Sequence, residues 1–429
     1  MFRNGSVTNQ DITTHFNYVE KNPITKQGLF KALNKVNPDV FPVILRSFAE
    51  KFYENEYEKL KDYMVIAADG TFYDLPPALE IRERYGGHMT SKITVDQIRK
   101  PQAKGSILYD VINRVIIDAC IAPYRTSELP LLYRHMENCK ALLKNKKVLL
   151  LADRYYGSAE LFLYCLMYNI KFCIRGKNYF YKDYVNGVEL DGMIEISFDK
   201  AWIRRLKRED CKEYASQCGK IKLRVVKNTY TYQEGKSEKT VESIYFTNLD
   251  AEEFSTDEIV SLYHTQRWEV ETAYSTLKGH LEIERFNSAK YNIVTNEIYG
   301  KMLCYNIGGL FYKASEKEIE SEKQTKKKKY TYLPNMKNII DTLRREKKLI
   351  RLFATPTRGY RKNKKWDSYL QELIRRFSRE KVPVRPNRHV KRWGRWVSSP
   401  LPAKFRLDGR RNPIYKKCFK IPGYVSCSH

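Results

Sequence analysis

The chain has 429 residues, of which 42% are apolar and 13% aromatic, so it can bury a large core and is not a disordered protein. Its formal net charge of +28 is unevenly spread, because residues 321–429 hold 32 Lys and Arg against 7 Asp and Glu. A basic tail on a near-neutral body favours a polyanionic partner, and nucleic acid is the first candidate.

Cysteine usage and hydropathy exclude further classes of protein. The nine cysteines are an odd number without a C-x-x-C pair, which argues against a disulfide framework or a zinc site and predicts reduced thiols. The opening residues lack the apolar core of a signal peptide, and no stretch approaches the roughly 18 apolar residues of a membrane span. We therefore expect a soluble cytoplasmic protein without a membrane partner.

The first part of the chain predicts a small helical N-terminal module over residues 1–62. Apolar positions recur at helical spacing between residues 10 and 61, and Asn37-Pro38 opens a new segment. Such a module either packs on the main domain or binds DNA ends, because a helical pattern alone does not identify a partner.

Residues 63–175 predict the first part of an α/β core. Short apolar runs at YMVIAAD, GSILYDVI and RVIIDACI read as neighbouring strands with a tight turn at Asn113 and Arg114. A helix is then expected at about 125–145, followed by the strand KKVLLLAD, a helix at SAELFLYCLMYN and the strand KFCIR. Strands that first form a meander and then alternate with helices predict a mixed β-sheet.

The remaining chain divides into three predicted parts. Alternating patterns such as KIKLRVVK predict a β-rich insertion over residues 176–248. Residues 249–315 return to the core with a long helix from about residue 256, where Ser255 and Glu258 form a predicted capping box. Residues 316–429 form a basic C-terminal region, with a candidate linker at KKKK (326–329) and basic, aromatic segments at 358–366 and 388–397 suited to phosphate contact.

Two aspartates follow apolar strand runs at the same kind of position. Asp69 ends the run VIAAD and Asp153 ends VLLLAD. An Asp-Gly pair after a strand is usually only a turn, so Asp69 by itself is weak support for a site. Two carboxylates that end two strands are more informative, because open α/β sheets commonly build their sites there.

The predicted long helix supplies a third carboxylate, Glu271. Tyr263, Arg267, Glu271 and Lys278 are spaced 4, 4 and 7 residues apart and therefore share one helix face. A solvated face with an Arg267–Glu271 ion pair would show the same spacing. Glu269 is the nearest rival for the metal carboxylate, but it does not share the face of Arg267 and Lys278.

The chemistry of phosphodiester cleavage explains why such residues would be assembled. Three carboxylates, Asp69, Asp153 and Glu271, can hold two Mg²⁺ ions about 4 Å apart, which activate the attacking oxygen and stabilise the leaving one. Arg267 and Lys278 beside them would grip the phosphates that flank the scissile bond. Without these basic side chains, a pocket of three acids would repel DNA.

Several other residues have less specific readings. Trp268 could stack on a displaced base, although a Trp at this position is more often in the core. Arg175, which ends the strand KFCIR, could contact DNA or support the site. Asp110 and Asp118 lie within strand runs and are expected to serve turns or pairing, and the seven histidines show no metal-ligand spacing.

With these residues in view, the chain resembles a DD-E transposase of the bacterial insertion-sequence family 4 over most of residues 20–310. The Tyr-Arg-Glu-Lys signature of that family maps onto Tyr263, Arg267, Glu271 and Lys278, with three residues between Tyr and Arg where the family has two. Tyr263, Arg267 and Lys278 are thereby expected to contact DNA, and the extra residue keeps Tyr263 on the same helix face but rotates it relative to Arg267. The other matching segments, in the family's order, are FKALNKVNPDVFPVILRSF, AADGT, GSILYDVINRVIIDACIAP, LLADRYYGSAELF, KFCIRGK and ETAYSTLKGHLEIERFNS.

The resemblance implies a ribonuclease-H-like catalytic core interrupted by the β-rich insertion. It also implies two Mg²⁺ or Mn²⁺ ions, double-stranded DNA as partner, cleavage at terminal inverted repeats and strand transfer into target DNA, by a cut-and-paste route. Members of the family act as dimers, so a homodimer in a synaptic complex is expected.

Three alternatives stay open at this point. The chain could be a catalytically inactive or domesticated DNA-binding descendant of a transposase, a basic RNA-binding protein, or a ribonuclease-H-like nuclease that hydrolyses without strand transfer. The presence of Asp69, Asp153 and Glu271 argues against the first, and the absence of an RNA-binding signature argues against the second. Detection of joined products would separate the third from a transposase.

Overall fold

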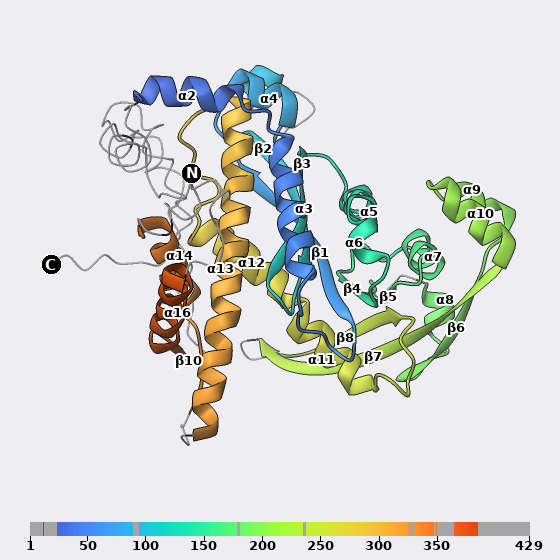
Figure 1. The fold of residues 1–429 in the computed structure, drawn as a ribbon. Coiled ribbons are helices and arrows are strands. Elements are labelled where there is room, and N and C mark those ends of the chain that lie inside the picture. Colours follow the sequence, from blue (N-terminus) through green and yellow to red (C-terminus); the bar gives the residue numbers. More distant parts are fainter. Residues whose placement is uncertain are drawn as a thin grey trace.

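A computed structural model of the chain describes residue 12 and residues 24–88, 94–177, 181–234, 237–325, 330–346, 349 and 364–384. Its centre is one large sheet with helices on both faces, and the long helix α13 runs beside α3 along one side (Figure 1). Of the segments expected to be basic or linking, residues 326–329, 388–397 and most of 358–366 lie outside the described residues.

The sheet has eight strands in the order β3-β2-β1-β4-β5-β8-β7-β6. The first three strands pair antiparallel, β1 pairs parallel with β4, and β4 pairs parallel with β5. The expected mixed sheet is therefore confirmed. The strands are β1 (Met64–Asp74), β2 (Gln102–Asp110), β3 (Val115–Pro123), β4 (Val148–Ala152), β5 (Lys171–Arg175), β6 (Asp191–Ser197), β7 (Lys220–Glu234) and β8 (Ser237–Thr247).

Strand β1 lies at the centre of the core, and its side chains alternate between the two faces. Val65 and Ala67 enter one hydrophobic cluster, whereas Met64, Ile66 and Ala68 enter the other. All five are fully buried, as expected for a central strand covered on both faces. The alternation also fixes the register, because a slip of one residue would exchange the two faces.

Different helices cover each face. The cluster that contains Val65 and Ala67 draws on α4 (Leu79–Tyr85), α11 (Thr256–Gln266), α12 (Trp268–Gly279), α13 (Tyr291–Thr325), α14 (Met336–Arg345) and α16 (Lys364–Arg379). The other cluster draws on α5 (Glu128–Asn138), α6 (Lys140–Leu143), α7 (Ala159–Met167) and α10 (Glu209–Cys218).

The N-terminal helices pack on the main domain. Helix α2 (Lys26–Lys35) contacts α13, and α3 (Val40–Tyr53) contacts both α13 and the edge strand β3. Buried Leu45, Ala49 and Tyr53 form the inner side of α3. Packing is therefore observed for α3, whereas α2 has no buried residue, and binding of DNA ends by this module stays a prediction.

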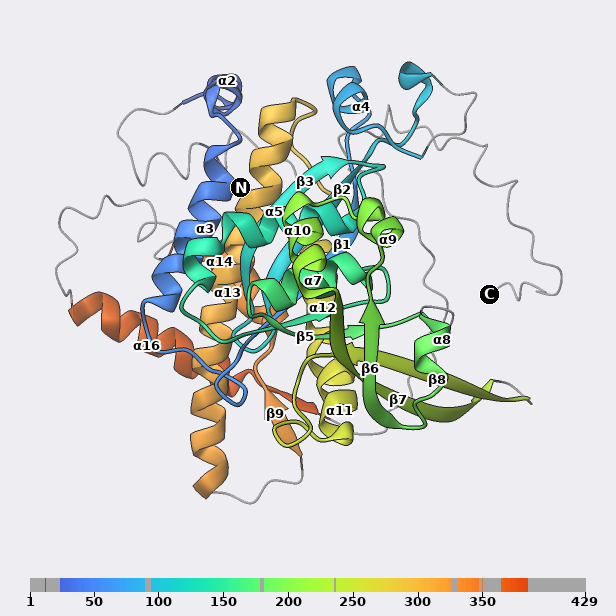
Figure 2. The same cartoon turned by 90° about the vertical axis from the view of Figure 1, so that its right-hand side faces the viewer.

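The insertion continues the central sheet instead of forming a sheet of its own. Strand β8 pairs antiparallel with β5, and β7 and β6 follow it to the far edge (Figure 2). The expectation that this segment is simply β-rich is incomplete, because it also contains α8 (Lys182–Val185), α9 (Lys200–Arg205) and α10. Cys211 and Ala215 of α10 pack into the same core as α7, and this tertiary burial is not visible as a strand pattern.

The described part of the C-terminal region packs on the outer side of α13. Both α14 and α16 contact α13, and β9 (Thr331–Leu333) pairs antiparallel with β10 (Val382–Val384).

A short 3-10 helix, η1 (Val95–Gln97), lies near α4. Among the described residues, no helix is long and apolar enough to cross a membrane, and the seven described cysteines are all free thiols.

Candidate active site

The two aspartates extend from the same end of two adjacent parallel strands. The pairing of β1 with β4 ends at Ala67 and Leu151, and Asp69 and Asp153 each follow two residues later. The expectation that a strand ends at Asp69 is wrong, since β1 continues to Asp74. The reason is that β2 pairs with β1 along this whole stretch, from Asp110 to Gln102.

A single guanidinium brings the three predicted carboxylates together. Nη2 of Arg267 lies 3.8 Å from Oδ2 of Asp69 and 4.0 Å from Oδ2 of Asp153. Nη1 of Arg267 donates a hydrogen bond to Oε1 of Glu271 over 2.5 Å. The Arg267 side chain is only 12% exposed, so this cation is shared among three acids in a partly dry pocket.

The electrostatics of the pocket show a surplus of negative charge. Burial is the largest cause that raises the pKa of Asp69 to about 7, and the charge of Asp153 raises it further against the opposing effect of Arg267. Burial also raises the pKa of Asp153. The carboxylates are therefore poorly compensated, as expected of oxygen donors that serve a cation.

The helical segment that carries Arg267 and Glu271 is divided into two helices. The expectation of one long helix from residue 256 is wrong, because α11 ends at Gln266 and α12 begins at Trp268, although Arg267 between them keeps helical backbone angles. The start of α11 is as expected: Ser255 and Glu258 form both bonds of the capping box.

The rest of the predicted helix face points toward the sheet. Tyr263 is buried, and its ring centroid lies 5.9 Å from the guanidinium carbon of Arg267. Lys278 donates a hydrogen bond to the carbonyl of Phe72 on β1 over 2.6 Å and lies 3.3 Å from Oε1 of Glu284. Its side chain stays 35% exposed, so it reaches the surface beside the strand that carries Asp69.

Aromatic and basic side chains surround the pocket on its exposed side. The preferred interpretation of Trp268 as a core residue is wrong, since this residue is 59% exposed. Tyr155, two residues after Asp153, is 66% exposed and has Arg154 and Lys177 near its ring. The sequence signal for Tyr155 is the RYY that follows Asp153, which has the ordinary composition of a strand–helix connection.

Arg175 and Glu269 are held by other partners. Arg175 donates a hydrogen bond to Oγ of Ser243 over 3.0 Å. Glu269 lies 2.9 Å from Arg114, in the turn between β2 and β3, and so points away from the Asp69 pocket. Only Glu271 of these two glutamates contacts Arg267.

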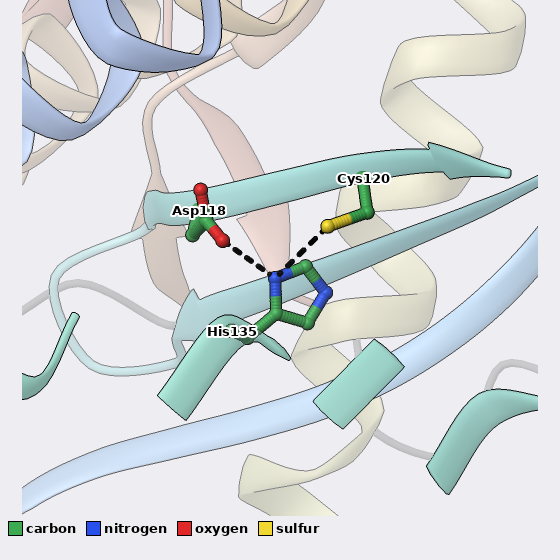
Figure 3. Close-up of side chains that lie close together, drawn as sticks. All are labelled: Asp118, Cys120 and His135. Carbon is green, nitrogen blue, oxygen red and sulfur yellow. Dashed lines mark hydrogen bonds and ion pairs between the residues drawn. The ribbon is translucent and has the colours of Figure 1, made fainter. Parts of the chain in front are cut away.

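A separate group of polar side chains, Asp118, Cys120 and His135, lies buried between β3 and α5 (Figure 3). Nδ1 of His135 lies 2.8 Å from Oδ2 of Asp118, and Nε2 lies 3.0 Å from Oγ of Ser106. Sequence reasoning missed this grouping because the histidine comes from a different element. Asp110 does serve a turn, as expected, since it accepts the backbone N–H groups of residues 112 and 113.

The Asp118–Cys120–His135 group forms a buried hydrogen-bonded charge pair. Burial alone would lower the pKa of His135, but the hydrogen bonds and charges of Asp118 and Cys120 outweigh it and raise the pKa to about 9. The arrangement therefore favours the protonated imidazole at neutral pH. Arg46 contacts the other oxygen of Asp118 at 3.0 Å and completes the pairing.

The fold and the pocket together define a class of protein. A five-stranded core in the order β3-β2-β1-β4-β5, with three antiparallel strands followed by two parallel ones, is the ribonuclease-H-like arrangement. Acidic residues from β1 and from the end of β4, joined by one from a later helix, occupy one end of this core.

The chain belongs to the family of transposase DDE domains, whose sequence model matches residues 60–307. Among solved structures, it is similar to a piggyBac transposase in a synaptic complex with hairpin DNA, with 12% sequence identity and a TM-score of 0.40, covering 91% of this chain and 76% of that one. No curated protein sequence matches the chain.

Proposed function

We propose that this transposase cuts DNA at the terminal inverted repeats of an insertion sequence and joins the ends to target DNA by a cut-and-paste route. The observation that carries the proposal is the convergence of Asp69, Asp153 and Glu271 on Arg267, all within the matched family segment. The proposed partners are double-stranded DNA and a second copy of the chain in a synaptic complex.

The donor set of the pocket fits divalent cations. Carboxylate oxygens are the ligands that Mg²⁺ and Mn²⁺ prefer, and burial raises the pKa of both aspartates in spite of the nearby charge of Arg267. Asp69, Asp153 and Glu271 would hold two such ions. When bound, the ions would supply an activated attacking oxygen and stabilisation of the leaving oxygen.

Arg267 has two proposed tasks. In the absence of cations its guanidinium keeps the three carboxylates near one another and limits their repulsion. Near DNA, the same planar group can donate to a phosphate beside the scissile bond. Because Tyr263 is buried against Arg267, we propose that it supports this guanidinium and does not contact DNA itself.

The DNA path is proposed to cross the exposed and half-buried residues beside the pocket. Lys278 and Arg175 provide positive charge for the phosphate backbone, and exposed Trp268 provides a ring on which an unpaired base can stack. Tyr155, flanked by Arg154 and Lys177, is a second aromatic surface of the same kind.

The test is a cleavage and strand-transfer assay on DNA that carries the inverted repeats flanking the gene, with Mg²⁺, Mn²⁺ or EDTA. Wild type should cut and join with either metal, Glu271→Ala should do neither, and Glu269→Gln should keep both activities. Cutting without joining would favour a hydrolytic nuclease. Binding without cutting in the wild type would favour a catalytically inactive DNA-binding descendant.

A further inference from the structure

A fourth carboxylate, that of Glu128, lies beside the three already described. Glu128 is the first residue of α5, and its side chain is 21% exposed. A Cβ atom on Gly70 would lie only 2.6 Å from Oε1 of Glu128, so this carboxylate rests directly on the backbone that follows Asp69. Glycine at position 70 is what allows such a close approach.

The counter-ion of Glu128 is a lysine from inside the sheet. Nζ of Lys104, on β2, lies 2.9 Å from Oε1 of Glu128 and 4.0 Å from the ring centroid of Phe72. Lys104 is buried, so the pair is shielded from solvent. In the described part of the chain, the ion pairs of the four carboxylates Asp69, Asp153, Glu271 and Glu128 are made with Arg267 and Lys104, and the charge of Arg154 also acts on Asp153.

A buried hydroxyl group interacts with Glu128. Tyr156 is fully buried, and its hydroxyl group forms no hydrogen bond of normal length and angle. Burial raises the pKa of this phenol most, and the charges of Glu128, Asp69 and Asp153 and an interaction of the hydroxyl group with Glu128 raise it further. An unpaired polar group at such a place costs free energy unless a ligand or water completes its bonding.

Helix α5 is held in a fixed position, and Glu128 with it. The buried contacts of His135 with Asp118 and Ser106 join the last turn of α5 to β3 and β2. The Glu128 carboxylate is therefore presented by a rigid element, as a cation site requires.

We propose that Glu128 is a further carboxylate of the divalent-cation site, and that Lys104 neutralises it when no cation is bound. The inference rests on the proposed function, because it extends the cation site of Asp69, Asp153 and Glu271. The competing explanation is that Lys104 and Glu128 form a structural ion pair with no part in cation binding.

Direct measurement of Mn²⁺ binding tests the proposal without any readout of activity. Binding to the full chain would be followed by electron paramagnetic resonance for wild type, Glu128→Gln, Asp153→Asn and Glu137→Gln. Glu137 is the matched control, since it lies on the same helix and its side chain is 66% exposed. We expect Glu128→Gln to weaken the affinity by about tenfold or more, and Glu137→Gln to leave it unchanged.

The outcomes separate the inference from the function on which it rests. If Asp153→Asn loses Mn²⁺ while Glu128→Gln binds as wild type, the role of Glu128 is overturned and the cation site stands. If wild type and Asp153→Asn bind equally, the cation site itself is overturned, and the inference with it.

The double variant Lys104→Met with Glu128→Gln excludes a structural effect. Breaking one side of a buried pair leaves an unpaired charge, whereas replacing both sides is often nearly neutral. A structural pair therefore predicts that the double variant regains wild-type Mn²⁺ affinity, and that result would overturn the proposal. We expect the affinity of the double variant to stay at the weakened level, with thermal unfolding in EDTA close to that of wild type.

Discussion

The sheet carries two acidic groups of opposite character, one around Arg267 and one around His135. In the first, Asp69, Asp153 and Glu271 share one guanidinium, and burial leaves the pKa of both aspartates raised. In the second, hydrogen bonds from His135, Asn138 and Arg46 outweigh burial and lower the pKa of Asp118. Buried charge with few partners is typical of the cation site that we propose for the first group, whereas fully paired charge is typical of a structural role.

The largest effect is expected from Asp153→Asn. A metal contributes several kcal/mol of charge stabilisation in the transition state, so loss of this ligand should slow DNA cleavage by about 10³-fold. The free energy of unfolding in EDTA should stay near the wild-type value, because the change removes a charge that is poorly compensated. Cleavage at the wild-type rate would show that Asp153 is not a residue of the active site. Strong destabilisation would show that Asp153 has a structural role like that of Asp118.

A smaller effect, on stability, is expected from pH at His135. Its folded-state pKa of about 9 lies above the unfolded value of about 6.5, so its stabilising contribution is complete below pH 6.5 and disappears as the pH rises through 9. The loss should be on the order of 3 kcal/mol, measured by urea unfolding between pH 6 and 10.

The charged and titratable groups that face His135 are Asp118 and Cys120 on β3, with Arg46 of α3 behind Asp118. Asp118→Asn is the control, since it removes the charge that holds the proton on the imidazole. The free energy of unfolding of this variant should not change over the same pH interval. An equally steep pH dependence in this variant would assign the titration to another group.

The smallest effect concerns Trp268, which is exposed and contributes little to the core. Trp268→Ala should change the free energy of unfolding by less than about 0.5 kcal/mol. If an unpaired base stacks on this ring, the affinity for nicked or frayed inverted-repeat DNA should fall by about 1 to 3 kcal/mol. Equal affinities of wild type and Trp268→Ala for such DNA would show that the unpaired base does not stack on Trp268.

The sequence predicted the sheet better than it predicted the helices. Uninterrupted apolar runs such as that of β4 identify buried strands, and the capping box at Ser255 marks the start of α11. The helices of the insertion were not predicted because α9 is short and α10 is held by packing on α7, which a local pattern does not contain. The continuation of β1 beyond Asp69 depends on pairing with β2, which a local pattern does not contain.

Within the candidate site, residues near in sequence were easier to group than residues near only in space. Arg267 and Glu271 are one helical turn apart, so their pairing follows from spacing. Glu128 had no such signal, because an acidic residue in the first turn of a helix is common for electrostatic reasons alone. Its neighbours Gly70 and Lys104 come from two different strands, and only the fold brings them to it.

The pairing of β8 with β5 has a consequence for how this protein can be shortened or recombined. Removing residues 176–248 would leave the N–H and C=O groups on one side of Lys171–Arg175 without partners, and the sheet would gain an open, apolar edge. Such an edge favours aggregation with other chains. The insertion is therefore not an exchangeable cassette, and a truncated enzyme would need a replacement strand at this edge to remain monodisperse.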